Sequence, residues 1–322
     1  MPRVVLLILT WNRRDDVLRC VASLPRLATA GVEPVVIDNA SRDDTVAALR
    51  AAHPGLTIIE NATNRGYAGG NNVGLRWALE RGAEFVQIIN SDTEVTSDMT
   101  GAMLREAERD PRIAVVGCRN LLMEDPTRLW GAYATLTYGP FLVRSDGAGA
   151  ADGPAWQVVR EVDSVIGNGY LWRASALREV GLLDESFFGY HEDVDWCLRA
   201  RRAGWRVVYA GHAAIIHQGG SSSDPEQPRS FPQSYFLGRN GVHFARKHAG
   251  AGEWARFAVL CAAAWSLRTA RARLRQLRAA DPAARRRAAQ QVAAERAFAR
   301  GALDALRGRP IPFAALGLTD AS

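Results

Sequence analysis

Residues 4–41 read VVLLILTWNRRDDVLRCVASLPRLATAGVEPVVIDNAS and contain two apolar runs separated by an amphipathic segment. The runs Val4–Leu9 and Pro34–Ile37 are short and continuous, which is typical of strands buried on both faces. Between them, Asp15–Leu27 carries apolar residues at the spacing of a helix. This order predicts an α/β, doubly wound, mostly parallel sheet. Ligands of such sheets bind beyond the carboxyl ends of the strands.

The same alternation continues as far as residue 117 and then gives way to a different composition. Between Arg119 and Glu161, glycine, proline, tyrosine and tryptophan are frequent, which indicates a hairpin or loop insertion. A polar, turn-rich loop is expected over Gly219–Arg229. The other expected strands are Leu56–Ile59, Phe85–Ile89 and Ile113–Gly117, and the other expected helices are Asp43–Arg50 with Ser41 as its N-cap, Asn72–Arg81, Ser97–Glu108, Ala174–Val180 and Glu192–Ala203.

Charge is divided unevenly along the chain. Its 322 residues include 40 Lys and Arg and 34 Asp and Glu, for a formal net charge of +6. The last 72 residues hold 13 basic and 5 acidic side chains, whereas the first 250 hold 27 and 29 and are close to neutral. Lys247 is the only lysine, which excludes a P-loop, because that site needs a lysine on the phosphates. It also argues against Schiff-base chemistry.

The N-terminus and the cysteines predict a cytoplasmic protein. The first residues superficially resemble a signal peptide, but the apolar run is short and lacks a small-residue cleavage site, so we interpret it as a strand. Four scattered cysteines without metal-ligand spacing fit packed thiols in a reducing compartment. No apolar stretch reaches the roughly 18 residues that a membrane-spanning helix needs.

Polar residues stand where three of the expected strands end, in Thr10–Asn12, Asp38–Ser41 and Asn90–Asp92. In a parallel sheet these ends fall on one edge, so their side chains converge on one cleft. The alternative is helix capping, which Asp, Asn and Ser perform at such junctions. Three polar ends together, two of them with carboxylates, favour a ligand site.

A glycine-rich segment, Asn64–Asn72, precedes an expected helix. Glycines let backbone amides approach a phosphate, and a helix N-terminus favours negative charge. The segment is not a dinucleotide-binding fingerprint, because it follows the third strand and the turn after the first strand has no glycine. A flexible turn before a capped helix is the alternative. Arg65 favours the ligand interpretation, since its guanidinium suits a diphosphate.

An acidic cluster, Glu192, Asp193 and Asp195, opens another expected helix. Stabilisation by the helix dipole is one explanation. A general base is the other, because crowding and partial burial raise the pKa of a carboxylate into a useful range. Further along, His217 stands alone at the end of an apolar run, and as a metal ligand it would need a carboxylate beside it, which Asp92 supplies.

Several motifs occur in a recognisable order: TWNR from Thr10, DNxSxDxT from Asp38, NRGYAGGNNxG from Asn64, NSD from Asn90, EDxDxCxR from Glu192, and the late His217 before GGSS. This order resembles the family 2 glycosyltransferases of GT-A fold, especially their bacterial rhamnosyltransferase-like branch. The resemblance covers about residues 3–245.

The resemblance implies an inverting transfer of one sugar from a nucleoside-diphosphate sugar to a hydroxyl of a glycan, lipid-linked or natural-product acceptor, with Mg²⁺ or Mn²⁺. The best single donor is dTDP-rhamnose, followed by other UDP- or dTDP-hexoses. Asp193 would be the general base, with Glu192 beside it, and Asp92 and His217 would hold the metal. Donor-binding residues would be Thr10, Asn12, Arg13, Asp38, Asn39, Ser41, Asn64, Arg65, Gly66, Gly70, Asn71, Asn90, Ser91 and Asp92. Acceptor-side residues would be Gly167, Asn168, Gly169, His191 and Asp195.

Two departures from the family pattern matter. Asn90 replaces the first acid of the D-x-D motif, which leaves one carboxylate fewer for the metal. The Q-x-x-R-W motif of processive polymerases is absent, so we expect one sugar or a few per encounter.

Domain boundaries are expected at residues 118 and 248. Residues 1–118 would form the nucleotide-sugar half and 119–248 the acceptor half of a GT-A catalytic domain. Residues 249–322 would form a basic helical extension, with breaks at Asp281-Pro282 and Gly308–Pro310.

Within the extension, residues 254–278 show an apolar stripe that turns into an arginine stripe. The apolar positions are Trp254, Phe257, Ala258, Cys261 and Trp265, and the arginines are Arg268, Arg271, Arg275 and Arg278. Such a helix either lies on the inner face of the plasma membrane or packs on the catalytic domain. A second amphipathic helix, Ala283–Arg307, suggests self-association as a homodimer. No aromatic and basic nucleic-acid-binding module is recognisable, so no nucleic-acid partner is expected.

Two other classes compete with the enzyme interpretation. One is a non-catalytic nucleotide-sugar or glycan-binding protein of the same fold, which Asn90 favours and the acidic cluster opposes. The other is a nucleotidyltransferase, which would carry a glycine-rich loop with a basic residue directly after the first strand. The segment Thr10–Arg13 lacks those glycines.

Overall fold

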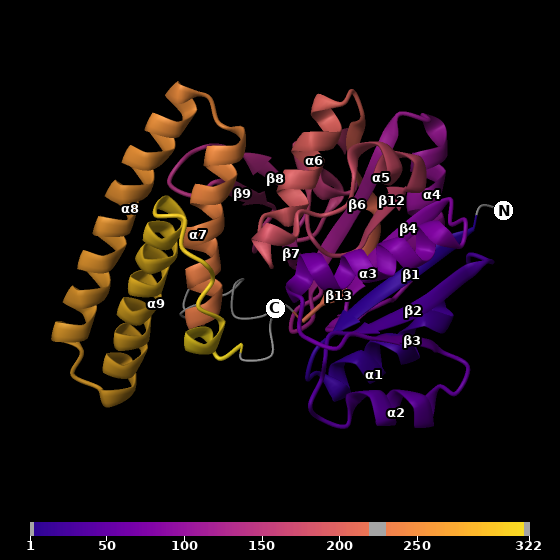
Figure 1. Ribbon diagram of the computed structural model, residues 1–322, viewed down its shortest axis with the longest axis horizontal. Coiled ribbons are helices and arrows are strands. Elements are labelled where there is room, and N and C mark those ends of the chain that lie inside the picture. The colour runs from indigo at the N-terminus through magenta and orange to yellow at the C-terminus, as the bar shows by residue number, and fades with distance from the viewer. Residues whose placement is uncertain (1–2, 219–229, 319–322) are drawn as a thin grey trace.

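A computed structural model describes residues 3–218 and 230–318, so the loop expected over Gly219–Arg229 lies outside the described residues. The main sheet has the strand order β10-β13-β6-β12-β4-β1-β2-β3, and the short strands β5 and β7 pair with β13 and β6 (Figure 1). Its strands are β1 (Val4–Thr10), β2 (Val32–Asp38), β3 (Thr57–Glu60), β4 (Phe85–Asn90), β5 (Thr93–Glu94), β6 (Ile113–Leu122), β7 (Leu129–Gly131), β10 (Val159–Glu161), β12 (Tyr170–Arg173) and β13 (Arg206–His217).

The first half of the sheet is parallel, as expected. Strand β1 pairs in parallel with both β2 and β4, and β2 pairs in parallel with β3. Strand β12 is antiparallel to both of its neighbours, β4 and β6, and beyond it β13 is again parallel to β6. The insertion over Arg119–Glu161 supplies most of a second, three-stranded sheet. That sheet consists of β8 (Tyr133–Leu136), β9 (Val143–Asp146) and β11 (Ser164–Val165).

Helices cover both faces of the main sheet because the side chains of each central strand alternate between two cores. On β1, Val5 and Leu7 belong to one hydrophobic cluster, and Val4, Leu6 and Ile8 belong to the other. The helices of this part are α1 (Arg14–Ser23), α2 (Thr45–Ala52), α3 (Gly66–Glu80), α4 (Met99–Arg109), α5 (Ala174–Val180) and α6 (Glu192–Arg202). This is the doubly wound arrangement that the sequence predicts.

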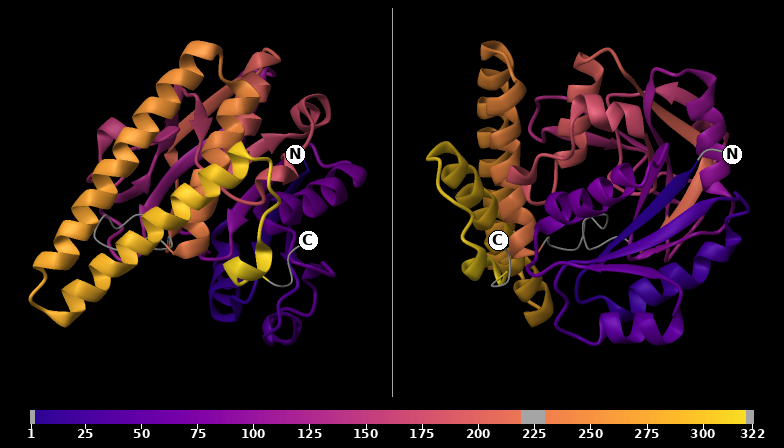
Figure 2. Two further views of the ribbon diagram at one scale, coloured as in Figure 1. Left: turned by 60° about the vertical axis from the view of Figure 1, so that its left-hand side comes forward. Right: turned by 45° about the vertical axis from the view of Figure 1, so that its right-hand side comes forward.

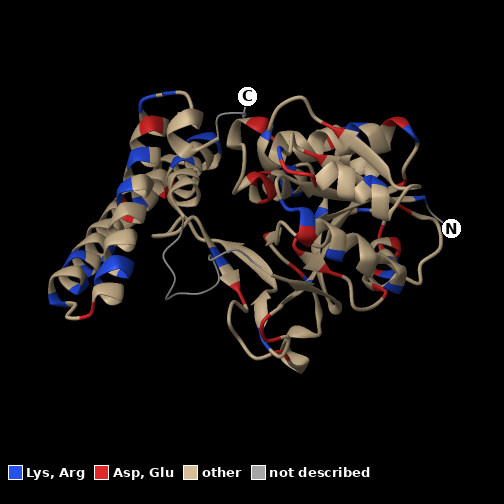
Figure 3. Cartoon of the chain, turned by 90° about the horizontal axis from the view of Figure 1, so that it is seen from below, with Lys and Arg blue, Asp and Glu red and all other residues tan. Residues whose placement is uncertain are grey.

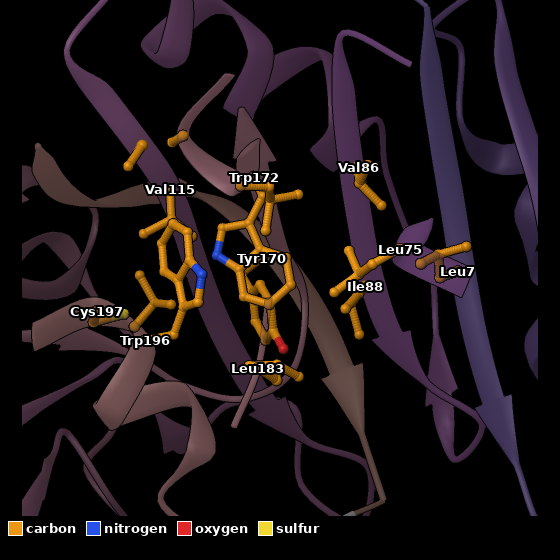
Figure 4. Close-up of a cluster of buried hydrophobic side chains, with 14 of the residues drawn as sticks. Leu7, Leu75, Val86, Ile88, Val115, Tyr170, Trp172, Leu183, Trp196 and Cys197 are labelled. Carbon is orange, nitrogen blue, oxygen red and sulfur yellow. The ribbon is translucent and has the colours of Figure 1, made fainter. Parts of the chain in front are cut away.

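One of the two cores holds the largest buried aromatic side chains of the sheet (Figure 4). Trp172 on β12 is 1% exposed and its ring centroid lies 5.0 Å from that of Trp196 on α6, which is fully buried. The Tyr170 ring packs against Trp172 with centroids 4.8 Å apart and planes tilted by 59°. Aromatic pairs at such distances add to the stabilisation from their buried area. They anchor α6, and with it the acidic cluster at its N-terminus, to the sheet.

Three long helices form a separate layer beside the sheet domain (Figures 1 and 2). They are α7 (Phe231–His248), α8 (Ala251–Arg278) and α9 (Pro282–Leu306). Helices α7 and α9 approach closely at glycines, since a Cβ on Gly238 would lie 2.0 Å from the carbonyl oxygen of Phe298, and one on Gly301 would lie 2.0 Å from that of Tyr235. None of the helices in the described ranges is long and apolar enough to cross a membrane.

The apolar stripe of α8 packs against protein, which is the second of the two interpretations left open for it. Phe257 is 4% exposed. The indole nitrogen of Trp265 donates a hydrogen bond of 2.8 Å to the carbonyl oxygen of Glu295 on α9, and Arg268 forms an ion pair with the Glu295 carboxylate at 2.9 Å. On α9, Val292 is buried as well. Self-association through α9 stays a prediction.

Several local expectations need correction. Asn64–Asn72 is not a loop before a helix, because α3 begins at Gly66. Ser41 is not the N-cap of α2; Asp43 accepts the amide hydrogen bond of Thr45 instead. No element was expected over α7, because its buried positions include Gln233, Ser234, Gly238, Asn240 and Gly241, which blur the apolar periodicity.

Candidate functional site

The polar ends of β1, β2 and β4 lie side by side, as predicted. Thr10 is in register with Asp38 on β2, and Leu9 is in register with Asn90 on β4. The chain therefore leaves the sheet at one edge three times, each time through polar residues. This edge is the carboxyl end of the parallel strands, where α/β sheets bind ligands.

At the ends of β1 and β2, two buried side-chain oxygen atoms have no hydrogen-bond partner within the described residues. They are Oγ1 of Thr10 and Oδ1 of Asp38. Both side chains are almost fully buried, with 2% and 3% of their surface exposed. The second carboxylate oxygen of Asp38 accepts a hydrogen bond of 2.9 Å from the amide of Ser41. Because buried polar atoms are normally paired, the unpaired oxygens indicate room for a polar ligand.

Asn12 and Ser41 tie the first two polar ends together. The backbone of Asn12 has φ 51°, in the left-handed region. Its amide donates to Oγ of Ser41 at 2.8 Å, and its side-chain oxygen accepts from the amide of Arg42 at 2.7 Å. Arg13 lies next to this turn, mostly exposed, and pairs with Asp16 at 3.2 Å. These hydrogen bonds hold the two loops at a fixed separation.

Asn39 is held by the protein through its whole side-chain amide. Its NH2 group donates to Oδ1 of Asn64 at 2.9 Å and to the carbonyl oxygen of Gly66 at 3.0 Å. Its oxygen accepts hydrogen bonds from Asn61 and from the amide of Arg65. Asn39 and Asn64 are both buried. They shape the floor of the edge, and Asn39 presents no free donor to it.

The glycines of α3 let the helix lie close to its neighbours. Gly66 has φ +68°, and a Cβ there would lie 2.3 Å from the carbonyl oxygen of Phe188. A Cβ on Gly70 would lie 2.6 Å from Cδ1 of Leu9. Asn71 is fully buried in the same helix and donates to the carbonyl oxygen of Tyr67. The glycine-rich signal therefore marks close helix packing next to the edge.

Arg65 forms an ion pair at 3.2 Å with Glu185, which also pairs with Arg76 at 3.0 Å. The Glu185 carboxylate further accepts from Asn72 at 2.9 Å. These contacts fasten α3 to the segment before α6. The guanidinium of Arg65 is 38% exposed, so it still reaches solvent at the site.

Asp92 and His217 face each other, as the sequence predicts for a metal pair. Oδ1 of Asp92 lies 3.1 Å from Nε2 of His217, which is 4% exposed at the end of β13. Burial alone would raise the pKa of Asp92, but the hydrogen bond and charge of His217 bring it below its ordinary value. Nδ1 of His217 and Oδ1 of Asn90 are buried without a partner among the described residues. Ser91, between Asn90 and Asp92, is 9% exposed.

Asn168 holds the NSD segment in place. Its side-chain oxygen accepts from the amide of Asn90 at 2.9 Å and from the hydroxyl of Thr93 at 3.2 Å, and its amide donates to Asn120 at 2.8 Å. The first two contacts hold the chain on both sides of Ser91 and Asp92, so Asn168 is a positioning residue for Asn90–Asp92. Gly169 beside it has φ +68°, and a Cβ there would lie 2.7 Å from Sγ of Cys118.

Two residues of this part were missed in the sequence. Asn120 is fully buried on β6 and reaches Asn168, and Trp130 contacts the His217 ring edge-on, with centroids 4.8 Å apart. No spacing rule marks Asn120, since it stands alone in an apolar strand. Trp130 belongs to the aromatic-rich insertion, whose composition was the available signal.

Glu192 and Asp193 are the first two residues of α6, and Asp193 lies next to the turn at Gly167. Glu192 is 4% exposed, and its Oε2 atom has no partner within the described part of the chain. Asp193 is half-buried, and a Cβ on Gly167 would lie 2.9 Å from its Oδ2 atom. Burial raises the pKa of Asp193 to about 6. Burial and the neighbouring charge of Asp193 raise the pKa of Glu192 well above its ordinary value.

The turn before α6 is strained. Phe188, Tyr190 and His191 all have positive φ angles, of 62°, 70° and 76°. Left-handed backbone costs energy for residues with a Cβ and persists only where the surroundings enforce it. Here the buried amide nitrogen of Asn240 on α7 lies 2.7–2.9 Å from three carbonyl oxygens of the turn. Burial lowers the pKa of His191 to about 4, so this imidazole is neutral.

Asp195 has a structural environment that differs from that of Asp193. It is completely buried and forms ion pairs with Arg199 at 2.8 Å, Lys247 at 2.7 Å and His248 at 2.6 Å. Although burial opposes ionisation, these partners lower the pKa of Asp195 to about 2. The carboxylate joins α6 to α7. These partners satisfy the Asp195 carboxylate without any contact to an acceptor substrate.

Tyr67 binds the turn at Gly167. Its hydroxyl donates to the carbonyl oxygen of Gly167 at 2.6 Å and lies 3.3 Å from the Tyr170 hydroxyl. Burial raises the pKa of Tyr67. The Gly167–Asn168 turn touches both carboxylate-bearing segments, since a Cβ on Gly167 would lie 2.9 Å from Oδ2 of Asp193 and Asn168 accepts a hydrogen bond from the amide of Asn90. Among the described residues, no group of three or more His, Cys, Asp and Glu could hold a metal ion.

The sequence matches the models of two known protein families. Residues 5–163 match the family described as glycosyl transferase family 2, and residues 85–278 match the one described as glycosyl transferase family group 2. The chain is 27% identical over 267 residues to the N-acetylglucosaminyl-diphospho-decaprenol L-rhamnosyltransferase of Mycobacterium tuberculosis, covering 75% of this chain and 83% of the relative. It is 25% identical over 239 residues to the low-salt glycan biosynthesis hexosyltransferase of Haloferax volcanii, covering 71% and 70%.

Solved structures share the fold. A mannosyltransferase from Pyrobaculum calidifontis in complex with GDP-Man and Mn²⁺ matches 96% of this chain and 88% of its own, with a TM-score of 0.58 and 18% identity. GalNAc-T7 with UDP, GalNAc and Mn²⁺ matches 76% of this chain with a TM-score of 0.58 and 11% identity, although this chain spans only 51% of it. The sheet, the site at its edge and the family matches together show that the chain belongs to the family 2 glycosyltransferases and is a rhamnosyltransferase-like enzyme of GT-A fold.

Proposed function

We propose that the enzyme transfers one sugar, with inversion, from a nucleoside-diphosphate sugar to an acceptor hydroxyl, with Asp193 as the general base. The observation that carries this proposal is the Gly167–Asn168 turn, which touches both carboxylate groups. A Cβ on Gly167 would lie 2.9 Å from Oδ2 of Asp193, and Asn168 binds the amide of Asn90, next to the Asp92–His217 pair. The leaving diphosphate needs its negative charge neutralised, whereas the attacking hydroxyl needs a base that takes its proton. Asp92 has a lowered pKa and stays ionised, as a metal ligand must, and Asp193 has a raised pKa, as suits a base.

Asp193 suits the base because burial raises its pKa to about 6, close to neutral pH. It would accept the proton of the acceptor hydroxyl as the hydroxyl oxygen forms its bond to the anomeric carbon. The bond between the anomeric carbon and the diphosphate oxygen breaks in the same step, and the electron pair leaves with the diphosphate. Burial and the charge of Asp193 also raise the pKa of Glu192 well above its ordinary value, which disfavours a second negative charge beside Asp193.

Asp92 and His217 fit a divalent cation, and Mg²⁺ or Mn²⁺ is the proposed cofactor. Carboxylate oxygens suit these ions, which are commonly held by one or two protein groups together with substrate phosphates. The imidazole Nε2 and the carboxylate face each other at 3.1 Å, and the unpaired Oδ1 of Asn90 lies in the same corner. When bound, the cation would neutralise charge on the diphosphate. Both solved neighbours named above contain Mn²⁺.

The nucleotide would occupy the edge between β1 and β2. Thr10 and Asp38, with their unpaired oxygens, would face the base and ribose, and Arg65 would lie along the diphosphate. A dTDP-linked rhamnose is the proposed donor, supported by the name of the mycobacterial relative, which describes an L-rhamnosyltransferase. The same name supports a lipid-linked acceptor.

Domain roles and location follow from this assignment as proposals. Residues 1–118 would bind the nucleotide sugar and residues 119–248 the acceptor, with residues 249–322 as a basic extension. We place the enzyme in the cytoplasm at the inner face of the plasma membrane. Free thiols at Cys20, Cys118, Cys197 and Cys261 support a reducing compartment.

The test is a panel of dTDP-, UDP- and GDP-sugars incubated with Mg²⁺ or Mn²⁺, with release of nucleoside diphosphate as the readout. We expect turnover of a dTDP- or UDP-hexose, and a loss of about 100-fold or more in Asp193→Asn, since general base catalysis contributes that much. Asp281→Asn is the control, because Asp281 is an exposed N-cap of α9 and Asn caps equally well. No turnover of any sugar, or an unchanged Asp193→Asn enzyme, would refute the catalytic assignment.

A further inference from the structure

The outer face of α8 carries a stripe of exposed aliphatic side chains. Leu260, Leu267 and Leu274 follow one another at seven-residue spacing, which keeps them on one side of a helix. They are 38%, 58% and 45% exposed. Leu277, three residues after Leu274, and Val259, directly before Leu260, widen the stripe at its two ends and are 81% and 67% exposed. We refer to these five residues as the α8 stripe.

The α8 stripe faces away from the protein. The other side of the helix bears Phe257, Trp265 and Ala272, which are buried or half-buried against the neighbouring helices. Trp265 and Arg268 on that side bind Glu295 of α9. Single exposed leucines are ordinary, but a line of them along one helix marks an interaction surface.

Arginines border the α8 stripe. Arg271 and Arg278 lie four residues after Leu267 and Leu274, so they share its side of the helix. Together with Arg275, they are exposed and form no ion pair with any described residue. Across the turn, Arg285, Arg286 and Arg287 open α9 and are also exposed.

The end of the helical layer where α8 is followed by α9 is almost free of acidic groups. Asp281 is the one acidic residue between Glu253 and Glu295 in the sequence. Figure 3 shows the basic segments of α8 and α9 gathered where the two helices meet, away from the sheet domain. The surface therefore combines apolar side chains with uncompensated positive charge.

Charge decides among the partners that such a surface fits. A second copy docked on the same face would bring two arginine clusters together, which is unfavourable. Nucleic acid would bind the arginines, but its phosphate backbone gives leucines no apolar surface to contact. A bilayer with anionic headgroups accepts both, with leucines inserted among the acyl chains and arginines on the phosphates.

We propose that the α8 stripe and its bordering arginines are the surface by which this enzyme binds an anionic phospholipid bilayer. The proposal deepens the membrane location given above, and it assigns the contact to the side of α8 opposite the tryptophans. The Trp254–Trp265 side, which the sequence offered for that contact, is committed to packing.

The experiment is co-sedimentation of the full-length enzyme with vesicles. Vesicles of phosphatidylcholine with one-third phosphatidylglycerol should retain the enzyme, and vesicles of phosphatidylcholine alone should retain about tenfold less, since each arginine near an anionic surface adds to binding. Retention should fall as salt is raised. Equal retention on both vesicles, or none on either, overturns the proposal.

Two matched double variants test the surface itself. Leu267→Gln/Leu274→Gln should weaken binding to the anionic vesicles by about tenfold or more, because two apolar side chains are lost from the contact. Leu303→Gln/Leu306→Gln on α9 is the control, because those leucines are 46% and 45% exposed and lie outside the stripe. Both variants should keep the melting temperature of the wild type within a few degrees.

Two further readouts separate this proposal from others. Nucleotide release in solution without vesicles should be unchanged in Leu267→Gln/Leu274→Gln, so a failure of the glycosyltransferase proposal would be visible independently. Sedimentation velocity should show no wild-type dimer that is lost in Leu267→Gln/Leu274→Gln. Such a dimer would assign the stripe to a second copy, and undiminished vesicle binding by the variant would also refute the proposal.

Discussion

Asp193 and Asp195 are two residues apart on one helix and have opposite electrostatic environments. Asp193 loses water without gaining a cation, so its pKa rises to about 6. Asp195 loses more of its exposed surface but gains ion pairs with Arg199 and Lys247 and a hydrogen bond with His248, and its pKa falls to about 2. Local sequence places both aspartates in the first turn of α6. Two of the three partners that distinguish them, Lys247 and His248, come from α7, far along the chain.

The pH profile of turnover should report Asp193. A general base must be ionised, so kcat/KM should rise with pH, with a midpoint at about 6, and level off above it. The cause is burial of the carboxylate, which disfavours its charged form. Steady-state rates between pH 5 and 8 at saturating metal give the profile. A midpoint near the ordinary aspartate value of about 4 would contradict the assignment.

Asp195 should matter for stability and not for chemistry. Because the folded pKa lies near 2 and the ordinary value is 3.8, its contribution is present above about pH 4 and is lost as pH falls toward 2. At pH 7, Asp195→Asn should lower the free energy of unfolding by about 2 kcal/mol. Urea denaturation at pH 7 and at pH 3 measures this, and the difference between the wild type and Asp195→Asn should shrink at the lower pH.

A surface pair provides the comparison for Asp195. Glu60→Gln breaks the pair with Arg50, whose side chains are 48% and 63% exposed, and should cost less than about 1 kcal/mol. If Asp195→Asn were as mild as Glu60→Gln, the buried network would contribute little. If it abolished turnover at unchanged stability, Asp195 would belong to the catalytic residues after all.

At the scale of elements, glycines determine how closely the helices approach their partners. Helix α3 lies on β1 because Gly70 leaves space for Leu9, and Gly74 leaves space for Leu7. The same device brings α7 onto α9 at Gly238 and Gly301. A glycine-rich segment that suggested a phosphate loop is therefore, in this fold, a closely packed helix beside the site.

The packing of α7 on α9 yields a stability prediction. In Gly238→Ala the new Cβ would lie 2.0 Å from a backbone oxygen, which cannot move without shifting a helix. We expect a loss of about 1–3 kcal/mol in the free energy of unfolding, as for overpacked cores. Chemical denaturation followed by circular dichroism measures it.

Gly252→Ala is the matched control, since Gly252 is also helical and no atom lies within 4 Å of the added methyl. Alanine favours the helix by up to about 1 kcal/mol, so this variant should be neutral or more stable. Equal behaviour of the two variants would show that the helices separate freely and that their close approach has no energetic weight.

At the scale of the whole molecule, the site joins segments from the entire sheet domain. Asp92 follows β4, His217 ends β13 and Asp193 opens α6. Ligands that bind such a site stabilise the folded chain, because unfolding separates their contacts. The free energy of unfolding in the presence of donor fragments therefore reports whether these segments bind one ligand together.

Metal and nucleotide should stabilise the enzyme jointly. At 100-fold excess over its dissociation constant, dTDP with Mn²⁺ should add about 2.7 kcal/mol to the free energy of unfolding, whereas dTDP alone should add less. In Asp92→Ala and His217→Ala the effect of the metal should disappear. His212→Ala, on the same strand with its side chain 38% exposed, should retain it. Thermal melting with and without EDTA gives the comparison, and an equal shift in every variant would exclude these two residues as ligands.

Much of this arrangement could be predicted from the sequence. Continuous apolar runs predicted the central strands, and their parallel order placed Thr10, Asp38 and Asn90 at one edge, because parallel strands end on the same side. Helix bounds such as Ala174–Val180 matched, and so did the breaks around the last helices. These are local properties, since periodicity and turn residues act over a few positions.

Only the tertiary structure decided which polar residues have partners. Asn39 and Asp195 looked like site residues in the sequence and are satisfied inside the protein. Asn168, which the sequence suggested for the acceptor side, holds Asn90 in place, and Asn240, which had no local signal, holds the turn before α6. It also decided which side of α8 is buried, because both sides carry apolar residues. A hydrogen bond or a buried face depends on what lies opposite in space. The sequence determined the strands and their polar ends, and contacts between distant segments determined what each side chain does.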